Sequence, residues 1–301
     1  MSPRSKAWVQ IHVCTVLWGF TAILGKLITL AALPLVWWRM LLVSALLVSW
    51  PPFRRGVRAM PPRLVAIYGG IGVVIAAHWV TFYASIKLAN ASVAATCMAL
   101  TPVFLAFVEP FTAQHRFDPR ELLLGLVALP GVALVVGGTP DSMRLGIAIG
   151  AVSAFAVAMF SALNKRFLQS SDALTVTGIE MAAGALAITV LGPLLPPEHV
   201  PWQLPGARDA ALLAVLAIGC TLLPFALWLI ALRNLSAYST ALAINMEPVY
   251  AVLLASLLLG ERHEVAPTFY VGVALVVAVA FGHPLLTRRI HADATIPGRL
   301  D

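Results

Sequence analysis

Long apolar runs separated by short polar segments fill most of this 301-residue chain. A helix needs about 20 apolar residues to cross a bilayer, and runs of that length predict ten transmembrane helices. They fall at residues 8–27, 32–50, 65–87, 90–109, 120–138, 144–163, 173–195, 209–232, 236–259 and 266–286. The pattern therefore predicts an all-α integral membrane protein, with residues 1–301 as a single transmembrane domain that ends in a tail, 287–301.

The composition supports a membrane protein and excludes several other classes. Hydrophobic residues make up 60% of the chain and charged residues only 11%, whereas soluble domains have about 25% charged residues. A soluble enzyme, a disordered chain and a nucleic-acid-binding domain are therefore not expected. The net charge of +7 has another origin in a membrane protein, because basic residues concentrate in cytoplasmic loops.

The positions of the basic residues predict the orientation. With the amino terminus inside, the cytoplasmic segments hold fourteen of the twenty lysines and arginines: Arg4, Lys6, Arg54, Arg55, Arg58, Arg63, Arg116, Arg120, Lys165, Arg166, Arg233, Arg288, Arg289 and Arg299. The positive-inside rule then places both termini, including the tail 287–301, in the cytoplasm.

The chain also repeats itself. A shift of 146 residues places Lys87 on Arg233 and Pro102 on Pro248, and a shift of 141 places Arg39 on Glu180. These offsets predict two five-helix repeats, residues 7–139 and 144–286. Because five is odd, the second copy would enter the membrane inverted, an arrangement typical of secondary transporters with a midplane solute site.

Four ionisable side chains lie at membrane depth, where an isolated charge is costly and indicates a cavity or a partner. His78 and Glu247 are the most central of the four, while Arg39 and Glu180 lie in the outer and inner thirds of their spans. We expect all four to be candidates for coupling transport to protons. His78 also remains open to a structural role in the core.

Proline follows a polar residue in the fourth and ninth predicted spans. Pro102 follows Thr101, and Pro248 follows Glu247. Proline removes a backbone donor and breaks the helix, which would free the carbonyls of Met98 and Ile244. Such a break is tolerated at membrane depth where it lines a cavity, although a simple kink with a neutral Glu247 remains the alternative.

Several aromatic and polar residues within the spans could line a pocket or serve only in packing. The solute-binding candidates are Trp18, His78, Trp79, Tyr83, Thr101, Phe155, Trp228, Asn245, Glu247 and Tyr250. Gly146 and Gly150 form a GxxxG pattern, which predicts a close helix contact. The three cysteines contain no CxxC motif, so neither a disulfide framework nor a metal site is expected.

Four short motifs, by their order and spacing, resemble the EamA-type members of the drug/metabolite transporter superfamily. They are "LWGFTAILGK" (17–26), "WWRM" (37–40), "ALTPVF" (99–104) and "NMEPVYAVLLASLLLGE" (245–261). The sequence departs from two-fold symmetry at His115, at Glu180 and at Phe155, which stands where a tryptophan matching Trp18 is expected. The resemblance implies a carrier of small metabolites with a cavity lined by helices 1, 3, 4, 6, 8 and 9.

The leading hypothesis is a secondary transporter in the cell (inner) membrane of a bacterium. It would move a small organic solute, such as an amino acid or an aromatic or amphipathic compound, by alternating access, as an exporter. Its partners would be the solute, the lipid bilayer and protons, with no cofactor, metal or nucleic acid. An intramembrane enzyme and a passive channel are the alternatives, but neither a HExxH nor a GxSxG motif occurs.

Overall fold

The computed structural model describes residues 1–112, 123, 130–131, 134, 138–168, 171–194, 200–244, 246–260, 267–268, 270–272 and 274–275. Regular secondary structure within these residues is helical throughout, and none of them lies in a strand. The predicted spans 120–138 and 266–286 fall largely outside the described residues. The predicted tail, 287–301, falls wholly outside them.

Seven helices of the described part are long and apolar enough to cross a membrane. They comprise α1 (Pro3–Leu27), α2 (Ala32–Ser49), α4 (Pro62–Leu88), α5 (Ala91–Cys97) continued by η1 (Met98–Leu100) and α6 (Thr101–Thr112), η2 (Asp141–Met143) with α9 (Arg144–Phe167), α10 (Ala173–Leu191) with η4 (Gly192–Leu194), and α11 (Ala207–Ala217) continued by η6 (Ile218–Leu222) and α12 (Leu223–Leu232). They correspond to seven of the ten predicted spans, so the structure supports an all-helical membrane protein.

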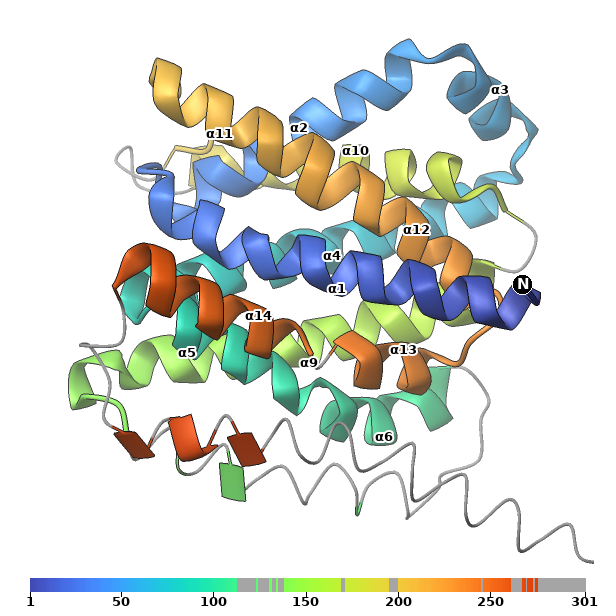
Figure 1. The fold of residues 1–301 in the computed structure, drawn as a ribbon. Helices are drawn as coiled ribbons and strands as arrows, with labels where there is room; N and C mark the ends of the chain where they lie inside the picture. Colours follow the sequence, from blue (N-terminus) through green and yellow to red (C-terminus); the bar gives the residue numbers. More distant parts are fainter. Residues whose placement is uncertain are drawn as a thin grey trace, which may run out of the picture.

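The predicted span 236–259 is a chain of shorter helices. It consists of α13 (Ala237–Ile244), α14 (Glu247–Leu254) and the π-helical segment η7 (Ala255–Leu259). A further short helix, α3 (Pro51–Ala59), follows α2 and carries exposed basic residues. In Figure 1, α3 and the amino terminus lie at the same end of the helix bundle.

Helix interruptions occur beside both of the predicted proline breaks. Ahead of Pro102, α5 gives way to the 3₁₀ segment η1, and the Thr101 N–H donates to the Met98 carbonyl. That carbonyl is therefore satisfied locally. Ahead of Pro248, α13 ends at Ile244 and α14 begins at Glu247. A proline in the first turn of the second helix has no N–H to continue the preceding ladder.

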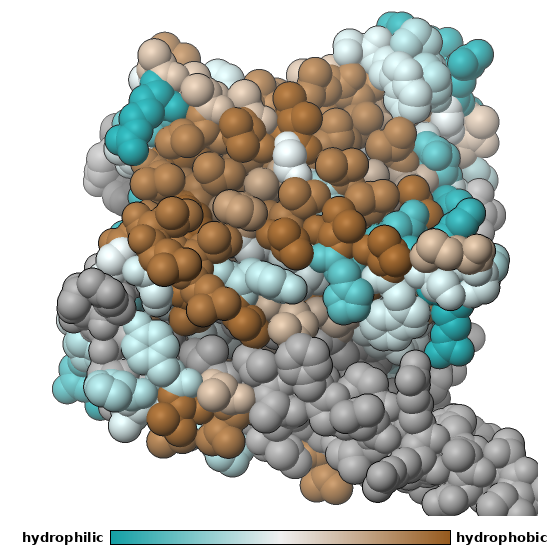
Figure 2. All heavy atoms as spheres, in the orientation of Figure 1, coloured by the Kyte–Doolittle hydropathy of each residue, from teal (hydrophilic) through white to brown (hydrophobic). Residues whose placement is uncertain are grey.

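The outside of the bundle is apolar. Figure 2 shows hydrophobic residues in a broad band across the middle of one face, with hydrophilic residues toward its edges. Leu186, Val190 and Leu257 are 63%, 65% and 80% exposed, and many other large apolar side chains are also at the surface. Apolar surface on this scale is unfavourable in water and suits contact with lipid tails.

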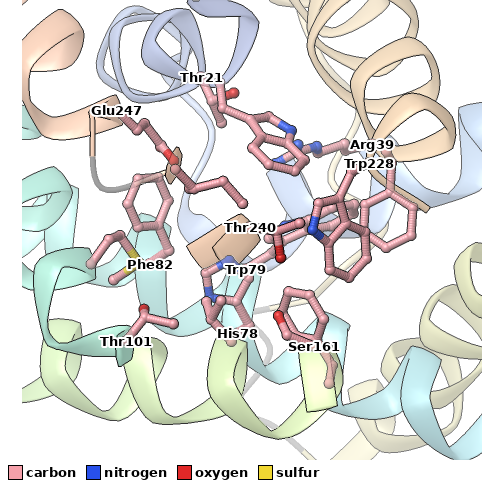
Figure 3. A pocket seen from close by; sticks show the side chains of 16 residues that line it. Thr21, Arg39, His78, Trp79, Phe82, Thr101, Ser161, Trp228, Thr240 and Glu247 are labelled. Carbon is pink, nitrogen blue, oxygen red and sulfur yellow. The ribbon is translucent and has the colours of Figure 1, made fainter. Parts of the chain in front are cut away.

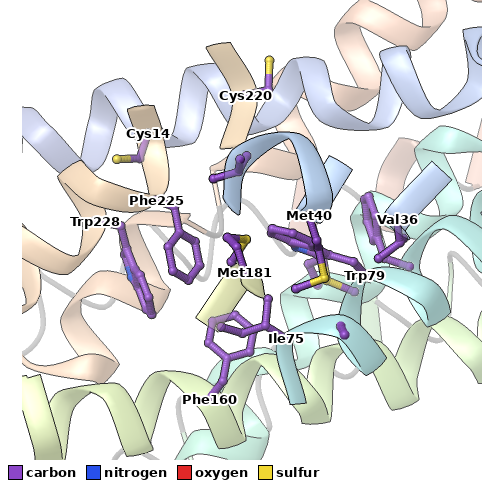
Figure 4. Packing of buried hydrophobic residues seen from close by; sticks show 14 of the residues in the cluster. Cys14, Val36, Met40, Ile75, Trp79, Phe160, Met181, Cys220, Phe225 and Trp228 are labelled. Carbon is purple, nitrogen blue, oxygen red and sulfur yellow. The ribbon is translucent and has the colours of Figure 1, made fainter. Parts of the chain in front are cut away.

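Helix α4 packs against α9 and α10, while α1 packs against α12 and α14 (Figure 1). Side chains from α2, α4, α9, α10 and α12 converge in one buried apolar cluster (Figure 4). Glycines permit the closest approaches. A Cβ added to Gly150 would lie 2.8 Å from Cys97 Sγ, and one on Gly146 would lie 2.8 Å from Ala89 Cβ. The predicted contact at the GxxxG pattern is thus confirmed.

The contact between α4 and α10 has the same origin and can be tested. A Cβ on Gly72 would overlap with backbone atoms of Glu180, whereas a Cβ on Gly70 would meet nothing within 4 Å. We expect Gly72→Ala to lower the free energy of unfolding by about 1–3 kcal/mol, the usual cost of overpacking. Gly70→Ala should leave it unchanged or slightly higher. Equal thermal unfolding midpoints of the two variants in detergent would contradict this packing.

Candidate functional site

A cavity lies between the helices at mid-depth of the bundle (Figure 3). The space open to the centre of a water molecule is about 80 Å³, several times the roughly 10–15 Å³ that one water requires. Its lining comes from the interiors of the helices and consists of Trp18, Thr21, Arg39, His78, Trp79, Phe82, Met98, Thr101, Val157, Phe160, Ser161, Phe225, Trp228, Thr240, Ile244 and Glu247. Six of the sixteen lining side chains are Trp or Phe, and three carry ionisable groups, Arg39, His78 and Glu247.

Arg39 brings a positive charge to this cavity and is only 1% exposed. Its Nε donates to Thr221 Oγ1 at 2.5 Å, its Nη1 to Tyr83 OH at 2.9 Å and its Nη2 to the Cys220 carbonyl at 3.3 Å. Its Cζ lies 3.8 Å from the centroid of the Trp79 ring, a cation–π contact. These bonds use three of the five guanidinium N–H groups, which leaves donors for an anionic ligand.

A local irregularity of the backbone creates the acceptors for Arg39. Pro224 has no N–H, so the carbonyl four residues earlier, at Cys220, has no donor from the α-helical ladder. The chain forms the π-helical segment η6 here, in which Thr221 Oγ1 donates to the Leu216 carbonyl at 2.7 Å. The Cys220 carbonyl and the Thr221 hydroxyl oxygen are thereby turned toward the arginine.

His78 is held by one residue of the neighbouring helix α9. Its Nδ1 lies 2.7 Å from Ser153 Oγ, and Ser153 Oγ donates to the His78 carbonyl at 2.9 Å. Because the single hydroxyl hydrogen is used in the second bond, we infer that Nδ1 carries the proton and donates to Ser153. In a neutral ring Nε2 is then an acceptor on a side chain that lines the cavity.

Glu247 supplies a carboxyl group at the start of α14 and is 8% exposed. In Figure 3 it lies on one side of the cavity, with Arg39 and Trp228 on the other. Glu247 and Arg39 interact electrostatically but form no ion pair at contact distance. Within the described residues, the ion pair that is found joins exposed Arg144 to Asp141. The cavity therefore has two separated polar ends, which we call its poles: the guanidinium group of Arg39 and the carboxyl group of Glu247.

The walls between these poles are aromatic. Trp228 contacts Trp18, Phe160 and Phe225, with ring centroids 6.4, 5.7 and 5.2 Å away. Two lining groups, Trp228 Nε1 and Thr21 Oγ1, have no hydrogen-bond partner among the described residues. Buried polar groups are normally hydrogen-bonded, so these two atoms are suited to bind a polar ligand or water.

The structure brings together only some of the candidates named from sequence. Trp18, His78, Trp79, Thr101, Trp228, Arg39 and Glu247 line the cavity. Tyr83 is buried beside Arg39 but is not in the lining, and Phe155 and Tyr250 are 45% and 37% exposed and lie outside it. Glu180 is buried elsewhere, between α4 and α10. Asn245 falls outside the described residues, as does the side chain of Pro248.

Sequence reasoning missed several lining residues, among them Thr21, Phe82, Ser161 and Phe225. Helical spacing could have indicated three of them, because Thr21 lies three residues after Trp18, Phe225 three before Trp228 and Phe82 four after His78, each on the same helix face as the candidate. The same spacing does not indicate Ser161. Over the described part of the chain, no group of three His, Cys, Asp or Glu side chains could hold a metal ion.

The long apolar helices and the cavity between them define a multi-pass membrane protein with an internal cavity. The chain belongs to the EamA-like transporter family, which matches it twice, over residues 6–137 and 144–287. This membership fits the drug/metabolite transporter superfamily indicated by the motifs.

Similar proteins include two that are named as transporters. An uncharacterized inner membrane transporter of Salmonella typhimurium, YicL, is 26% identical over 86% of this chain and 89% of its own length. An uncharacterized transporter of Archaeoglobus fulgidus is 25% identical over 96% of this chain and 99% of its own. One crystal structure, 20% identical, covers 95% of this chain and 99% of its own with a TM-score of 0.69, which shows the same fold.

The bonds of Arg39 lead to a prediction about its side chain. Lysine keeps the charge but cannot reproduce the guanidinium fork, so Arg39→Lys should lower the free energy of unfolding by at least about 1.5–3 kcal/mol, the contribution of one hydrogen bond to a charged group. Thermal unfolding in detergent measures the change. Arg208→Lys, at an exposed position, is the matched control, and equal midpoints for both variants would contradict the assigned role.

Proposed function

We propose that this protein is a secondary transporter that carries a small organic solute across the cytoplasmic membrane by alternating access, as an exporter. The observation that carries this proposal is the cavity, in which Arg39 and Glu247 form opposite poles of an aromatic-lined space inside the helix bundle. The family and the transporter names of its relatives support a transporter rather than an enzyme.

The chemistry of the cavity favours a solute with two charged or polar ends and an apolar or aromatic body. The donors left on Arg39 suit a carboxylate or another anionic group, and the Glu247 carboxylate suits an amine. Indole and phenyl rings between them offer apolar surface and faces that attract cations. An amino acid or a similar amphipathic zwitterion combines these features.

The helix contacts support the proposal of two inverted repeats. Exchange of the repeats would convert the contact of α4 with α9 into that of α12 with α1. It would likewise convert the contacts of α5 and α6 with α9 into those of α13 and α14 with α1, and all of these contacts are present. The helix starts also correspond, because Asn90 accepts from Val93 N–H and Ser236, 146 residues later, accepts from Ser239 N–H. Inverted repeats that can exchange conformations provide a physical basis for alternating access.

The proposed orientation places the end of the bundle with the amino terminus and α3 in the cytoplasm. Arg54, Arg55 and Arg58 are carried by α3, and the positive-inside rule assigns such clusters to the cytoplasmic side. Glu247 would meet the cationic end of the solute or, in its absence, a proton. His78 Nε2 would accept a hydrogen bond from the solute.

Purified protein in liposomes tests this function, and Glu247→Gln tests the site. Solutes that raise the thermal stability of the protein should cross the membrane of liposomes that contain it. The glutamine variant should bind amine-bearing solutes about 10- to 100-fold more weakly, because it loses a charged hydrogen bond of about 1.5–3 kcal/mol, and its binding should no longer depend on pH.

Glu109→Gln is the matched control, since Glu109 is a buried carboxyl outside the cavity lining. If no stabilising solute moves under a solute or proton gradient, transport is contradicted. If Glu247→Gln binds amine-bearing solutes with unchanged affinity and pH dependence, the role of Glu247 is contradicted.

A further inference from the structure

A second buried carboxyl group lies outside the solute cavity. Glu180, in the first half of α10, is 0% exposed, and so is Asn164 of α9. The two side chains interact, yet neither carboxyl oxygen and neither amide atom has a partner of regular hydrogen-bond geometry among the described residues. A buried carboxyl group without a cation partner requires an explanation, because such groups are normally paired or hydrogen-bonded.

Among the described residues, no positive charge interacts with the Glu180 carboxyl group. Elements packed against α10 include α2, α3, α4 and α12, and no charged group of these has a described interaction with the carboxyl. Tyr68 of α4 is the titratable side chain that faces it, and Arg233 interacts with Tyr68 in turn. Glu109, by contrast, interacts electrostatically with Lys165.

Burial without a cation determines the state of the carboxyl group. An isolated carboxylate in a low-dielectric interior is so unfavourable that the group takes up a proton instead. The protonated form can donate to the amide oxygen of Asn164, which the ionised form cannot do. A metal ion fits less well, because hard cations such as Ca²⁺ take about six to eight oxygen ligands and Glu180 and Asn164 together offer three side-chain oxygens.

Side chains bonded to carbonyls join the helices at the end of the bundle nearest Glu180. Glu180 is the eighth residue of α10, about 10 Å along the axis from its start. Tyr68 OH donates to the Phe167 carbonyl at 2.7 Å, and Arg233 donates to the Ser171 carbonyl. Lys165 Nζ donates to the carbonyls of Leu232 and Leu235 at 2.7 and 2.6 Å. These bonds join α4, α9, the start of α10 and the end of α12.

We propose that Glu180 is a proton-binding site, distinct from the solute cavity, that stabilises the conformation closed at this end. While α4, α9 and α10 are packed together, the carboxyl group is dry and holds its proton. When this end opens, water reaches Glu180, the O–H bond breaks and the proton passes to water on that side. The inference rests on the proposed alternating access, and it adds the group through which pH acts on that equilibrium.

The consequence is a specific pH dependence of opening. If the closed state holds one more proton than the open state, the ratio of open to closed molecules rises by up to about tenfold per pH unit. Acid at this end would favour closure and alkali would favour opening. The glutamine variant mimics the protonated acid, so Glu180→Gln should stay closed without a pH response.

Distances between nitroxide labels measure this ratio without knowledge of the solute. The labels would be attached at Ala59 in α3 and at Asn234 after α12, both exposed, in a background without Cys14, Cys97 and Cys220. In the otherwise unchanged protein, the long-distance population should grow as the pH is raised. It should stay constant in Glu180→Gln, while Asp141→Asn, at an exposed carboxyl group, should retain the original response.

Infrared difference spectra supply a second measurement, which does not require the glutamine variant to fold. The unchanged protein should show a protonated-carboxyl C=O band that disappears as the long-distance population grows, and Asn164→Ala should shift its frequency. A pH response that persists in Glu180→Gln, a response to sodium in place of pH, or the absence of such a band would overturn the proposal. Failure of solute flux in liposomes would instead contradict the proposed function.

Discussion

The positive charge of Arg39, fully buried at membrane depth, is the constraint on which the site depends. An unpaired charge there is expensive, and the surrounding structure compensates for it from two helical elements, α4 and η6. Trp79 covers one face of the guanidinium group, while Tyr83, Thr221 and the Cys220 carbonyl accept its hydrogen bonds. The Cys220 carbonyl is available to Arg39 because Pro224 has no N–H to donate to it. The proline and the π-helical segment η6 thus supply an acceptor for the buried charge. Glu247 lies across the cavity and forms no ion pair with Arg39 among the described residues.

Arg39 and Glu247, held apart across the cavity, leave more hydrogen-bonding capacity for a ligand than a buried salt bridge would. A contact pair would satisfy itself and would offer little to a ligand. The two separated poles both face the cavity. A solute with an anionic end and a cationic end can therefore bind Arg39 and Glu247 at the same time. The unpartnered indole N–H of Trp228 and hydroxyl of Thr21 agree with this view, since they too lack partners within the described part of the chain. Glu180 differs from Arg39 in this respect. No cation stabilises its charge among the described residues, and we propose that it is buried as a neutral acid.

Much of the fold could be predicted from sequence, because the length of an apolar run determines whether it can span a bilayer. The proline interruptions were equally accessible, since loss of an N–H is a local property of Pro102 and Pro248. The direction in which each side chain points was not. Helices that are apolar on every side carry no amphipathic signal, so Phe155 and Tyr250 were as plausible for the cavity as Trp18 and Trp228, although the structure places the first two partly at the surface. Glu180 is likewise one of the four ionisable residues that the sequence places at membrane depth, but α10 packs against α4 through Gly72, and Glu180 is not among the residues that line the cavity.

The most direct test of alternating access is the accessibility of the cavity from each side of the membrane. Ser161 lines the cavity on α9, and cysteine is a close substitute for serine in volume. The measurement is the reaction rate of Ser161→Cys with a membrane-impermeant thiol reagent, applied to each side in turn, in a protein without Cys14, Cys97 and Cys220, which are buried. Our account predicts labelling from both sides, with a bound solute changing the two rates in opposite directions. Labelling from one side only, with or without solute, would contradict it.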